Sequence, residues 1–396
     1  MPGMFLRQLL ALRSFARATI AALLTSVLTA LGNAGPIEPR EGLHVAHHFS
    51  FHFSHHDWEL ACDNTRTCRA AGYQADDAVL AVSLLLTRVA GPGAPVQARV
   101  ALGEYDAEAQ AAASRAQGPG RLVLWVDGRA LGALGWTTDQ ADKADKADAA
   151  GPGPGHFALS TPQLQAVRKA LLRPKARIEF RHGGQVWRLS DRGASAVLLK
   201  MDEAQGRIGT PGALARPGVG VSARPEGQAL PPLPVPVLRA ARVSAQGTTS
   251  TPPPGLSREA VAALRQALLQ QVDHDAFPPD SEEGQLRFAP LSGGQWLAST
   301  LCWRGAYNEG HCMWVVNARP PHQPRLVTDQ ASGYKAGVIT AFQKGRGLAD
   351  CVSEEAWVWD GRAFARSRAS GSGQCKLISP GGAWALPTWV VKVLGP

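Results

Sequence analysis

The chain has 396 residues, of which 45% are hydrophobic and 18% charged, and it contains 42 Gly, 29 Pro and 6 Cys. This apolar content excludes an intrinsically disordered protein, and the length predicts about two domains. The formal net charge is +9, but there is no dense Lys/Arg block and no basic patch interleaved with aromatic residues, so nucleic-acid binding is not indicated. A polytopic membrane protein is excluded as well, because the only long apolar stretch lies near the start of the chain.

Residues 1–34 have the three parts of a secretory signal peptide. Arg7, Arg13 and Arg17 precede an apolar run over residues 18–31, and small residues follow that run. The run is shorter than the roughly 20 residues that cross a membrane. We therefore expect a periplasmic or secreted protein that has no membrane span after signal cleavage. An uncleaved N-terminal anchor is the alternative.

Six cysteines follow the leader, and an even number of cysteines in an exported chain favours disulfides. They are Cys62, Cys68, Cys302, Cys312, Cys351 and Cys375. The first two are expected to close a local loop. The last four allow three connectivities, of which we favour Cys302–Cys312 and Cys351–Cys375, because each of these pairs flanks a predicted hairpin.

Residues 57–215 are predicted to form a first β-rich domain. Thr161-Pro162 indicates the start of a helix, with Thr at the cap and Pro in the first turn, and a second helix is expected over 194–204. Residues 139–155 are of low complexity and are interpreted as a solvated surface insertion. Apolar runs separated by Gly, Pro or Asp-Gly turns predict hairpins. These hairpins are expected over residues 79–102, 122–136 and 177–189.

Residues 216–255 are rich in Pro and Gly, which favours an extended and semi-rigid linker. They precede a second β-rich domain, residues 256–396, which is expected to begin with a helix capped by Ser257. Its strands are predicted over residues 295–303, 312–317, 356–359 and 362–366. The fold class that follows is mainly β (α+β), with two β-rich domains, a few short helices and stapling disulfides.

A histidine-rich segment, residues 35–56, precedes the first domain. Its histidines are His44, His47, His48, His52, His55 and His56. Imidazole is a good ligand for zinc and copper, so a metal site is one interpretation. Phe49, Phe51 and Phe53 alternate with polar residues, which instead favours an edge strand whose histidines face solvent and respond to pH.

The short loop between Cys62 and Cys68 is a second candidate site. A disulfide would fix its polar residues Asp63, Asn64 and Arg66, and a fixed loop binds a partner at a lower entropic cost. The alternative is a loop that only stabilises the fold, with Asp and Asn as turn formers.

Five motifs of the mature chain are long enough to be specific, namely residues 57–73, 198–214, 291–294, 302–308 and 350–362. Together they resemble the bacterial domain-of-unknown-function 1176 family of exported six-cysteine proteins. The resemblance spans nearly the whole mature chain and implies no established activity. The histidine-rich segment and residues 139–155 are peculiar to this chain. The first domain also resembles, more weakly, the invasion-associated locus B proteins, which implies an envelope or host-facing role.

No catalytic motif is found. Gly-x-Ser-x-Gly is absent, and Ser332-Gly-Tyr-Lys335 lacks the companion motifs of the Ser-x-x-Lys enzymes. We therefore expect a non-enzymatic binding or interaction module of the cell envelope, whose ligand or partner the sequence does not name. The alternatives are a periplasmic metal-binding protein and an envelope hydrolase without a recognisable motif.

Overall fold

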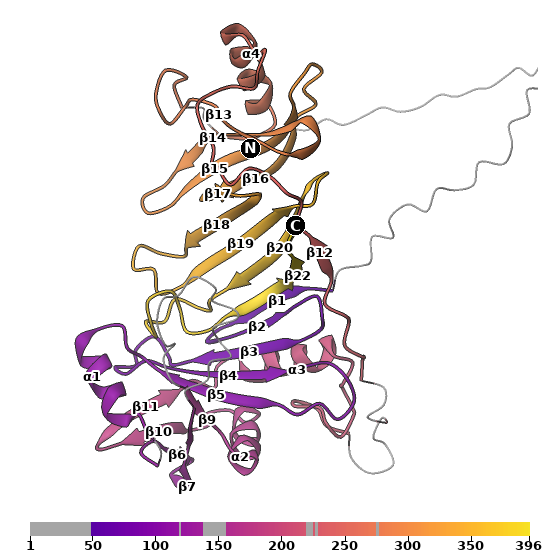
Figure 1. Ribbon diagram of the computed structural model, residues 1–396. Helices are drawn as coiled ribbons and strands as arrows, with labels where there is room; N and C mark the ends of the chain where they lie inside the picture. Colours follow the sequence, from indigo (N-terminus) through magenta and orange to yellow (C-terminus); the bar gives the residue numbers. More distant parts are fainter. Residues whose placement is uncertain (1–48, 119, 138–155, 219–224, 226–228, 275–276) are drawn as a thin grey trace, which may run out of the picture. The chain divides into compact units, whose positions relative to one another are not determined.

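A computed structural model of the chain describes residues 49–118, 120–137, 156–218, 225, 229–274 and 277–396, which belong to one compact unit. These residues form five sheets and four α-helices (Figure 1). None of the described helices is long and apolar enough to span a membrane. The expected signal peptide and the low-complexity segment 139–155 lie outside the described residues.

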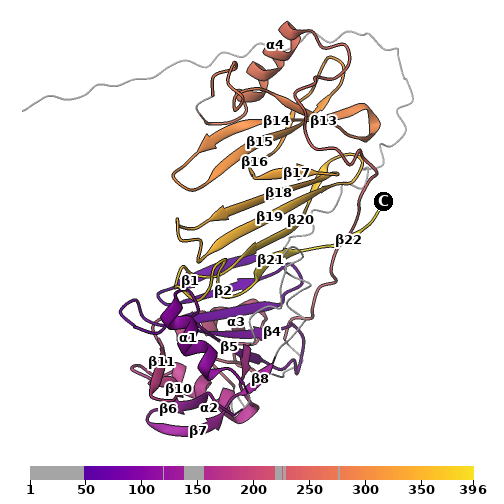
Figure 2. The same ribbon diagram turned by 60° about the vertical axis from the view of Figure 1, so that its left-hand side comes forward.

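The largest sheet has seven antiparallel strands in the order β1-β2-β3-β4-β5-β9-β8. Its strands are β1 (Phe51–His55), β2 (Trp58–Cys62), β3 (Cys68–Tyr73), β4 (Val82–Arg88), β5 (Gln97–Leu102), β8 (Gly135–Thr137) and β9 (His156–Ala158). Side chains alternate between the two faces of a strand, so a strand buried on both faces is continuously apolar or small. β2 is buried along its whole length and β4 at all but one residue, and both are mainly apolar, which places the sheet inside the molecule (Figure 2).

A smaller four-stranded sheet in the order β11-β10-β6-β7 and three helices accompany the large sheet. The strands are β6 (Val123–Val126), β7 (Arg129–Ala133), β10 (Ile178–His182) and β11 (Gln185–Leu189), and the helices are α1 (Ala107–Ala116), α2 (Thr161–Leu171) and α3 (Ala194–Ala204). Asp127 (φ 50°) and Gly128 (φ 83°) make the tight turn between β6 and β7, as the Asp-Gly pair predicts.

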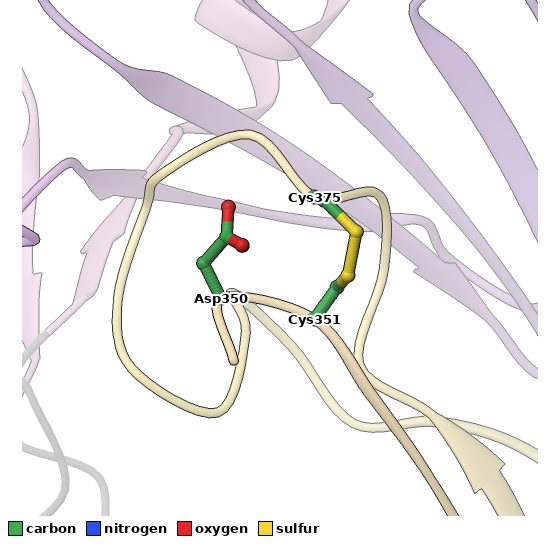
Figure 3. Close-up of side chains that lie close together, drawn as sticks. All are labelled: Asp350, Cys351 and Cys375. Carbon is green, nitrogen blue, oxygen red and sulfur yellow. A yellow bond between two sulfur atoms is a disulfide. The ribbon is translucent and has the colours of Figure 1, made fainter. Parts of the chain in front are cut away.

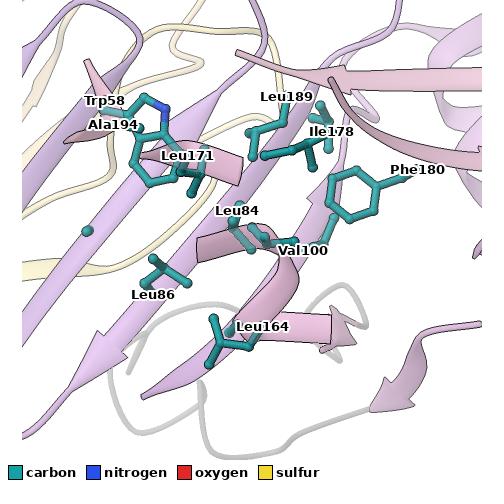
Figure 4. Packing of buried hydrophobic residues seen from close by; sticks show 14 of the residues in the cluster. Trp58, Leu84, Leu86, Val100, Leu164, Leu171, Ile178, Phe180, Leu189 and Ala194 are labelled. Atoms are coloured by element: carbon teal, nitrogen blue, oxygen red, sulfur yellow. The ribbon is translucent and has the colours of Figure 1, made fainter. Parts of the chain in front are cut away.

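One face of the large sheet, the small sheet and these helices enclose a common hydrophobic core (Figure 4). Its fully buried members come from all of these elements. They include Trp58, Leu84 and Val100 from the large sheet, Leu171 from α2, Phe180 and Leu189 from the small sheet, and Ala194 from α3. The indole of Trp58 donates to the Ser190 carbonyl oxygen at 2.8 Å, so this large side chain has its polar atom satisfied.

The C-terminal part begins with α4 (Arg258–Leu269), and Ser257 caps it by accepting from the Ala260 amide at 3.2 Å. Two antiparallel sheets follow, in the orders β13-β14-β15-β16 and β17-β18-β19-β20-β21. The strands are β13 (Arg287–Pro290), β14 (Gln295–Arg304), β15 (Glu309–Asn317), β16 (Arg325–Ala331), β17 (Gly333–Lys335), β18 (Val338–Lys344), β19 (Val352–Trp359), β20 (Phe364–Gly371) and β21 (Leu386–Val390). One face of β14 and β15 packs on α4, and the other packs on β18 and β19.

The N-terminal and C-terminal β regions are in contact. Trp384 and Leu386 pack on Ala61 and Tyr73 in a separate hydrophobic cluster, and the Trp384 indole donates to the Ser83 hydroxyl at 2.7 Å. In the Pro-rich segment, β12 (Val237–Arg239) pairs in parallel with β22 (Lys392–Leu394). The division into domains at residues 216–255 stays a prediction.

The β-rich fold class is confirmed, as are the three hairpins of the first region, the helix over 194–204 and the Ser257 cap. The prediction that Thr161 caps helix α2 is wrong by one residue. Ser160 is the cap, because it is extended and its amide binds the side chain of Gln163 at 2.9 Å, which leaves Thr161 as the first helical residue.

Candidate functional site

A buried carboxylate marks the strongest candidate site. Within β2, Trp58 and Leu60 face the large core, so Glu59 between them points to the opposite face of the sheet. Glu59 is only 4% exposed. One carboxylate oxygen accepts from the Tyr73 hydroxyl at 2.7 Å, and the other contacts Nε2 of His52 at 2.8 Å. A buried carboxylate is costly without such partners, so this trio is held in one arrangement.

Two of these groups have shifted pKa values. The hydrogen bond with Glu59 raises the pKa of His52 above its usual value of 6.5. Burial, and then the charge and hydrogen bond of Glu59, raise the pKa of Tyr73 well above 10.0, so Tyr73 stays a neutral donor. Gly373 has φ +99°, and a Cβ there would lie 2.1 Å from the Tyr73 hydroxyl. Only glycine lets the backbone come this close to the trio.

Glu59 and His52 open into a groove between the β1–β2 hairpin and the sheet of β19, β20 and β21. Its volume is about 450 Å³. On the other wall, Glu355 of β19 and Arg366 of β20 form an ion pair, and both are more than one-third exposed. The groove therefore presents a buried acid on one side and a pair of opposite charges on the other. Its size lies within the range of small-molecule sites.

The predicted histidine site is only partly within the described residues, which exclude His44, His47 and His48. His52 and His55 belong to the edge strand β1, with the alternating burial that the phenylalanines indicated. The rings of His55 and His56 lie 4.4 Å apart, whereas His52 is bound to Glu59. The binding of zinc or copper by this segment stays a prediction.

The predicted binding loop is closed by a Cys62–Cys68 disulfide, and its polar groups bind within the chain. Asp63, 2% exposed, accepts from the amides of Thr65 and Thr67 and from the Arg69 guanidinium. Asn64 binds the Val390 backbone.

Arg66, in a left-handed conformation (φ 66°), donates to the Pro231 carbonyl oxygen at 2.9 Å. These contacts are those of a loop that organises its surroundings. Recognition of a partner by this loop stays a prediction.

All six cysteines are paired, and the other two disulfides are the favoured ones, Cys302–Cys312 and Cys351–Cys375. In the part of the chain that the structure describes, Asp350, Cys351 and Cys375 are the one group of three potential metal ligands within 4.8 Å (Figure 3). Two of the three are oxidised to a disulfide, and Asp350 is bound to Arg346 and to the Leu377 amide at 2.8 Å. These bonds are typical of a disulfide that stabilises the fold.

Comparison with known proteins identifies the family. The model of a family described as "Protein of unknown function (DUF1176)" matches residues 52–391, and the chain belongs to that family. The chain is also similar to Uncharacterized protein YpfG of Escherichia coli (strain K12), with 25% identity over 355 residues that cover 85% of this chain and 92% of that protein. No solved structure matches it. The weaker resemblance to the invasion-associated locus B proteins stays a prediction.

The groove residues lie within the part of the chain that the family model matches. The matched range begins at His52 and includes Glu59, Glu355 and Arg366, whereas His44, His47 and His48 precede that range. Sequence reasoning singled out His52 but not its partners. The available signal for Glu59 was a lone acid inside an otherwise apolar five-residue strand.

Proposed function

We propose that this chain is a binding module of the cell envelope, exported by its N-terminal leader, and that the groove beside Glu59 is its ligand site. Three disulfides support an oxidising compartment, because disulfides persist in the periplasm and outside the cell and are rare in the cytosol. The basic and apolar start of the chain supports export to the periplasm. Fractionation of cells that express the full chain tests this step, with the mature protein expected in the periplasmic fraction and a mass that lacks residues 1–34.

The arrangement of charge in the groove carries the proposal. Glu59 places a buried carboxylate on one wall of the groove, while Arg366 offers guanidinium donors on the other wall. A small zwitterionic molecule, such as an amino acid or a short peptide, would place its ammonium near the carboxylates and its carboxylate on Arg366. Arginine is well suited to this role because its planar fork matches a carboxylate.

Binding is favoured over catalysis by the way in which His52 is used. A hydrolase of the serine type needs a hydroxyl within hydrogen-bond reach of its base. The serines that line the groove are Ser54, Ser353, Ser370 and Ser372, and among the hydrogen bonds of these described residues none joins a serine hydroxyl to His52. His52 is bound to Glu59 instead.

Thermal unfolding in the presence of alanine, dialanine and glucosamine tests the ligand site. A ligand at 100 times its Kd stabilises the folded chain by about 2.7 kcal/mol, so binding raises Tm. We expect dialanine to raise the Tm of the wild type and to have a smaller effect on Arg366→Gln. Glu203→Gln, which removes an exposed charge on α3, is the matched control. No rise in Tm with any of the three compounds, or an equal rise for Arg366→Gln, would contradict the proposal.

A further inference from the structure

A second surface, distant in sequence from the groove residues on β19 and β20, carries unbalanced positive charge. It is the outer face of the small sheet. In β10, Ile178 and Phe180 point to the core, so Glu179 and Arg181 point outward. Strand register places Arg188 and Trp125 on either side of Glu179. We call this surface the arginine face, defined by Trp125, Arg177, Glu179, Arg181, Val186 and Arg188.

Three guanidinium groups converge on the single carboxylate of Glu179. Arg177 Nε donates to one oxygen at 2.6 Å, and Arg188 donates to the same oxygen at 2.8 Å. Arg181 Nε donates to the other oxygen at 2.9 Å. Glu179 has no exposed side-chain surface, so the three arginines cover it. Among the described residues no other carboxylate pairs with them, and the cluster keeps a net charge of about +2 by simple count.

The arginines bury the acid but remain open to solvent themselves. Their side chains are 54%, 31% and 58% exposed for Arg177, Arg181 and Arg188. Each guanidinium has five N–H donors, and one carboxylate cannot accept from all of them. Donors are therefore directed outward from a rigid sheet, at a spacing fixed by the common acceptor. Groups with several anionic oxygens, above all phosphates, are the natural complement of such forks.

Apolar side chains accompany the charges. The Arg181 guanidinium lies 4.3 Å from the centre of the Trp125 ring, a cation–π contact that fixes both groups. On the neighbouring strand β11, Val186 is paired with Arg181 and is 40% exposed. Tryptophan and arginine beside an exposed aliphatic group are typical of surfaces that meet the headgroup region of a bilayer.

We propose that the arginine face binds the phosphate groups of an anionic phospholipid surface. The charge excess supplies the attraction, and Trp125 and Val186 supply apolar contact at the headgroup level. An open sheet face suits an extended surface, whereas an isolated phosphate would gain only the charge contacts. This inference does not depend on the proposed groove ligand, and such binding would hold the small sheet against a membrane surface.

Sedimentation with lipid vesicles tests the proposal. The chain purified from the periplasm is expected to bind vesicles of phosphatidylcholine mixed with phosphatidylglycerol, and to bind pure phosphatidylcholine vesicles far more weakly. Binding should weaken as salt is added, because exposed charges are screened. The double variant Arg177→Gln/Arg188→Gln leaves Arg181 on Glu179, and it should reduce the partition coefficient about 30-fold, at roughly five-fold for each charge. Arg239→Gln/Arg242→Gln removes two exposed charges elsewhere and is the matched control.

Four results would overturn the proposal. One is equal binding to both kinds of vesicle, and another is an equal loss for the control variant. The third is tight binding of a polyglutamate peptide with no binding of anionic vesicles, which would assign the face to an acidic protein. The fourth is a Tm that rises with inorganic phosphate, but not with chloride at the same ionic strength, while anionic vesicles are not bound, which would assign the face to free phosphate.

A second measurement remains decisive if the double variant does not fold. Brominated phosphatidylglycerol vesicles quench tryptophans that lie at the bilayer surface. We expect part of the wild-type fluorescence to be quenched and this part to be lost in Trp125→Phe. Quenching that is unchanged in Trp125→Phe would contradict contact of the arginine face with the membrane.

Discussion

The side-chain amide of Asn64 binds the backbone of Val390 as a neighbouring strand residue would. Its Nδ2 donates to the Val390 carbonyl oxygen at 3.0 Å, and its Oδ1 accepts from the Val390 amide at 2.7 Å. Asn308 repeats this arrangement with Lys344, at 2.8 and 2.9 Å. An asparagine therefore satisfies backbone groups at two places where a strand meets a different sheet. Buried backbone groups need such partners.

Replacement of Asn64 by alanine is expected to lower the free energy of unfolding by about 1 to 3 kcal/mol, because it leaves the Val390 amide and carbonyl groups without their partner. Urea unfolding measures this change. Asn317→Ala is the control, since the Asn317 amide makes exposed bonds of 3.3 Å within its own turn. Equal stability of Asn64→Ala and the wild type would show that water replaces the asparagine without cost.

The His52–Glu59 pair should make stability depend on pH in a defined direction. Because the folded pKa of His52 is raised above 6.5, its contribution is complete below that pH and is lost as pH rises through the folded pKa. The side chain is half exposed, so the effect is expected to be at most about 1 kcal/mol.

Urea unfolding of the wild type and His52→Gln on both sides of neutral pH checks the sign. The difference between the two proteins should be larger at acidic pH. His55→Gln serves as the control on the same strand, since His55 has no carboxylate partner among the described residues. A difference that grows with rising pH would contradict the assigned pairing.

Local chemistry made much of this fold predictable. The Asp127-Gly128 turn and the Ser257 cap are signals that act within a few residues, and the hairpin and the helix that they predict are present. The helix α1 was not predicted, because its alanines form no apolar stripe and only the Asp106 cap marks its start. Short-range signals therefore identify elements where the chain has strong turn or cap chemistry.

The site was less predictable, because its parts are brought together from distant positions. Glu59 and Arg366 lie about 300 residues apart, and no spacing in the sequence relates them. Glu354 and Glu355 are adjacent in β19, and the structure gives them separate partners, Arg368 and Arg366. Both residues line the groove, and nothing in the local sequence indicates this.

Glu179 should control the acid stability of the chain. Burial raises its pKa, but hydrogen bonds from Arg177, Arg181 and Arg188 outweigh burial and bring the pKa to about 2, below the usual 4.5. A lowered folded pKa contributes stability above pH 4.5, and this stability is lost as pH falls towards about 2. Glu179→Gln should therefore be less stable than the wild type at neutral pH, by about 2 kcal/mol or more.

Unfolding followed by circular dichroism at neutral and acidic pH measures this difference, which should shrink as pH falls below 4.5. Glu203→Gln, which breaks an exposed pair with Lys200, is the matched control and should change stability by less than about 1 kcal/mol. A difference that stays constant down to pH 2 would contradict the role of the three arginines.

The disulfides should differ in how much they add to the free energy of unfolding, because they close loops of different length. In the chain-entropy account a disulfide restricts the unfolded chain more when more residues lie between its cysteines. Cys351 and Cys375 are 24 residues apart, whereas Cys62 and Cys68 are 6 apart. That account gives about 3.5 kcal/mol for the longer loop and about 2.4 kcal/mol for the shorter one.

The longer loop also lies next to contacts that join the two β regions. It precedes Lys376, whose ammonium binds Asp57 at 2.8 Å and Asp76 at 2.6 Å across the two β regions. We therefore expect Cys351→Ser/Cys375→Ser to lose more stability than Cys62→Ser/Cys68→Ser in urea unfolding, and to lower the protection of the Trp384 region in hydrogen exchange. The short-loop variant should leave that region protected. A larger loss for the short-loop variant would show that packing of the Asp63 turn, and not chain entropy, decides the ranking.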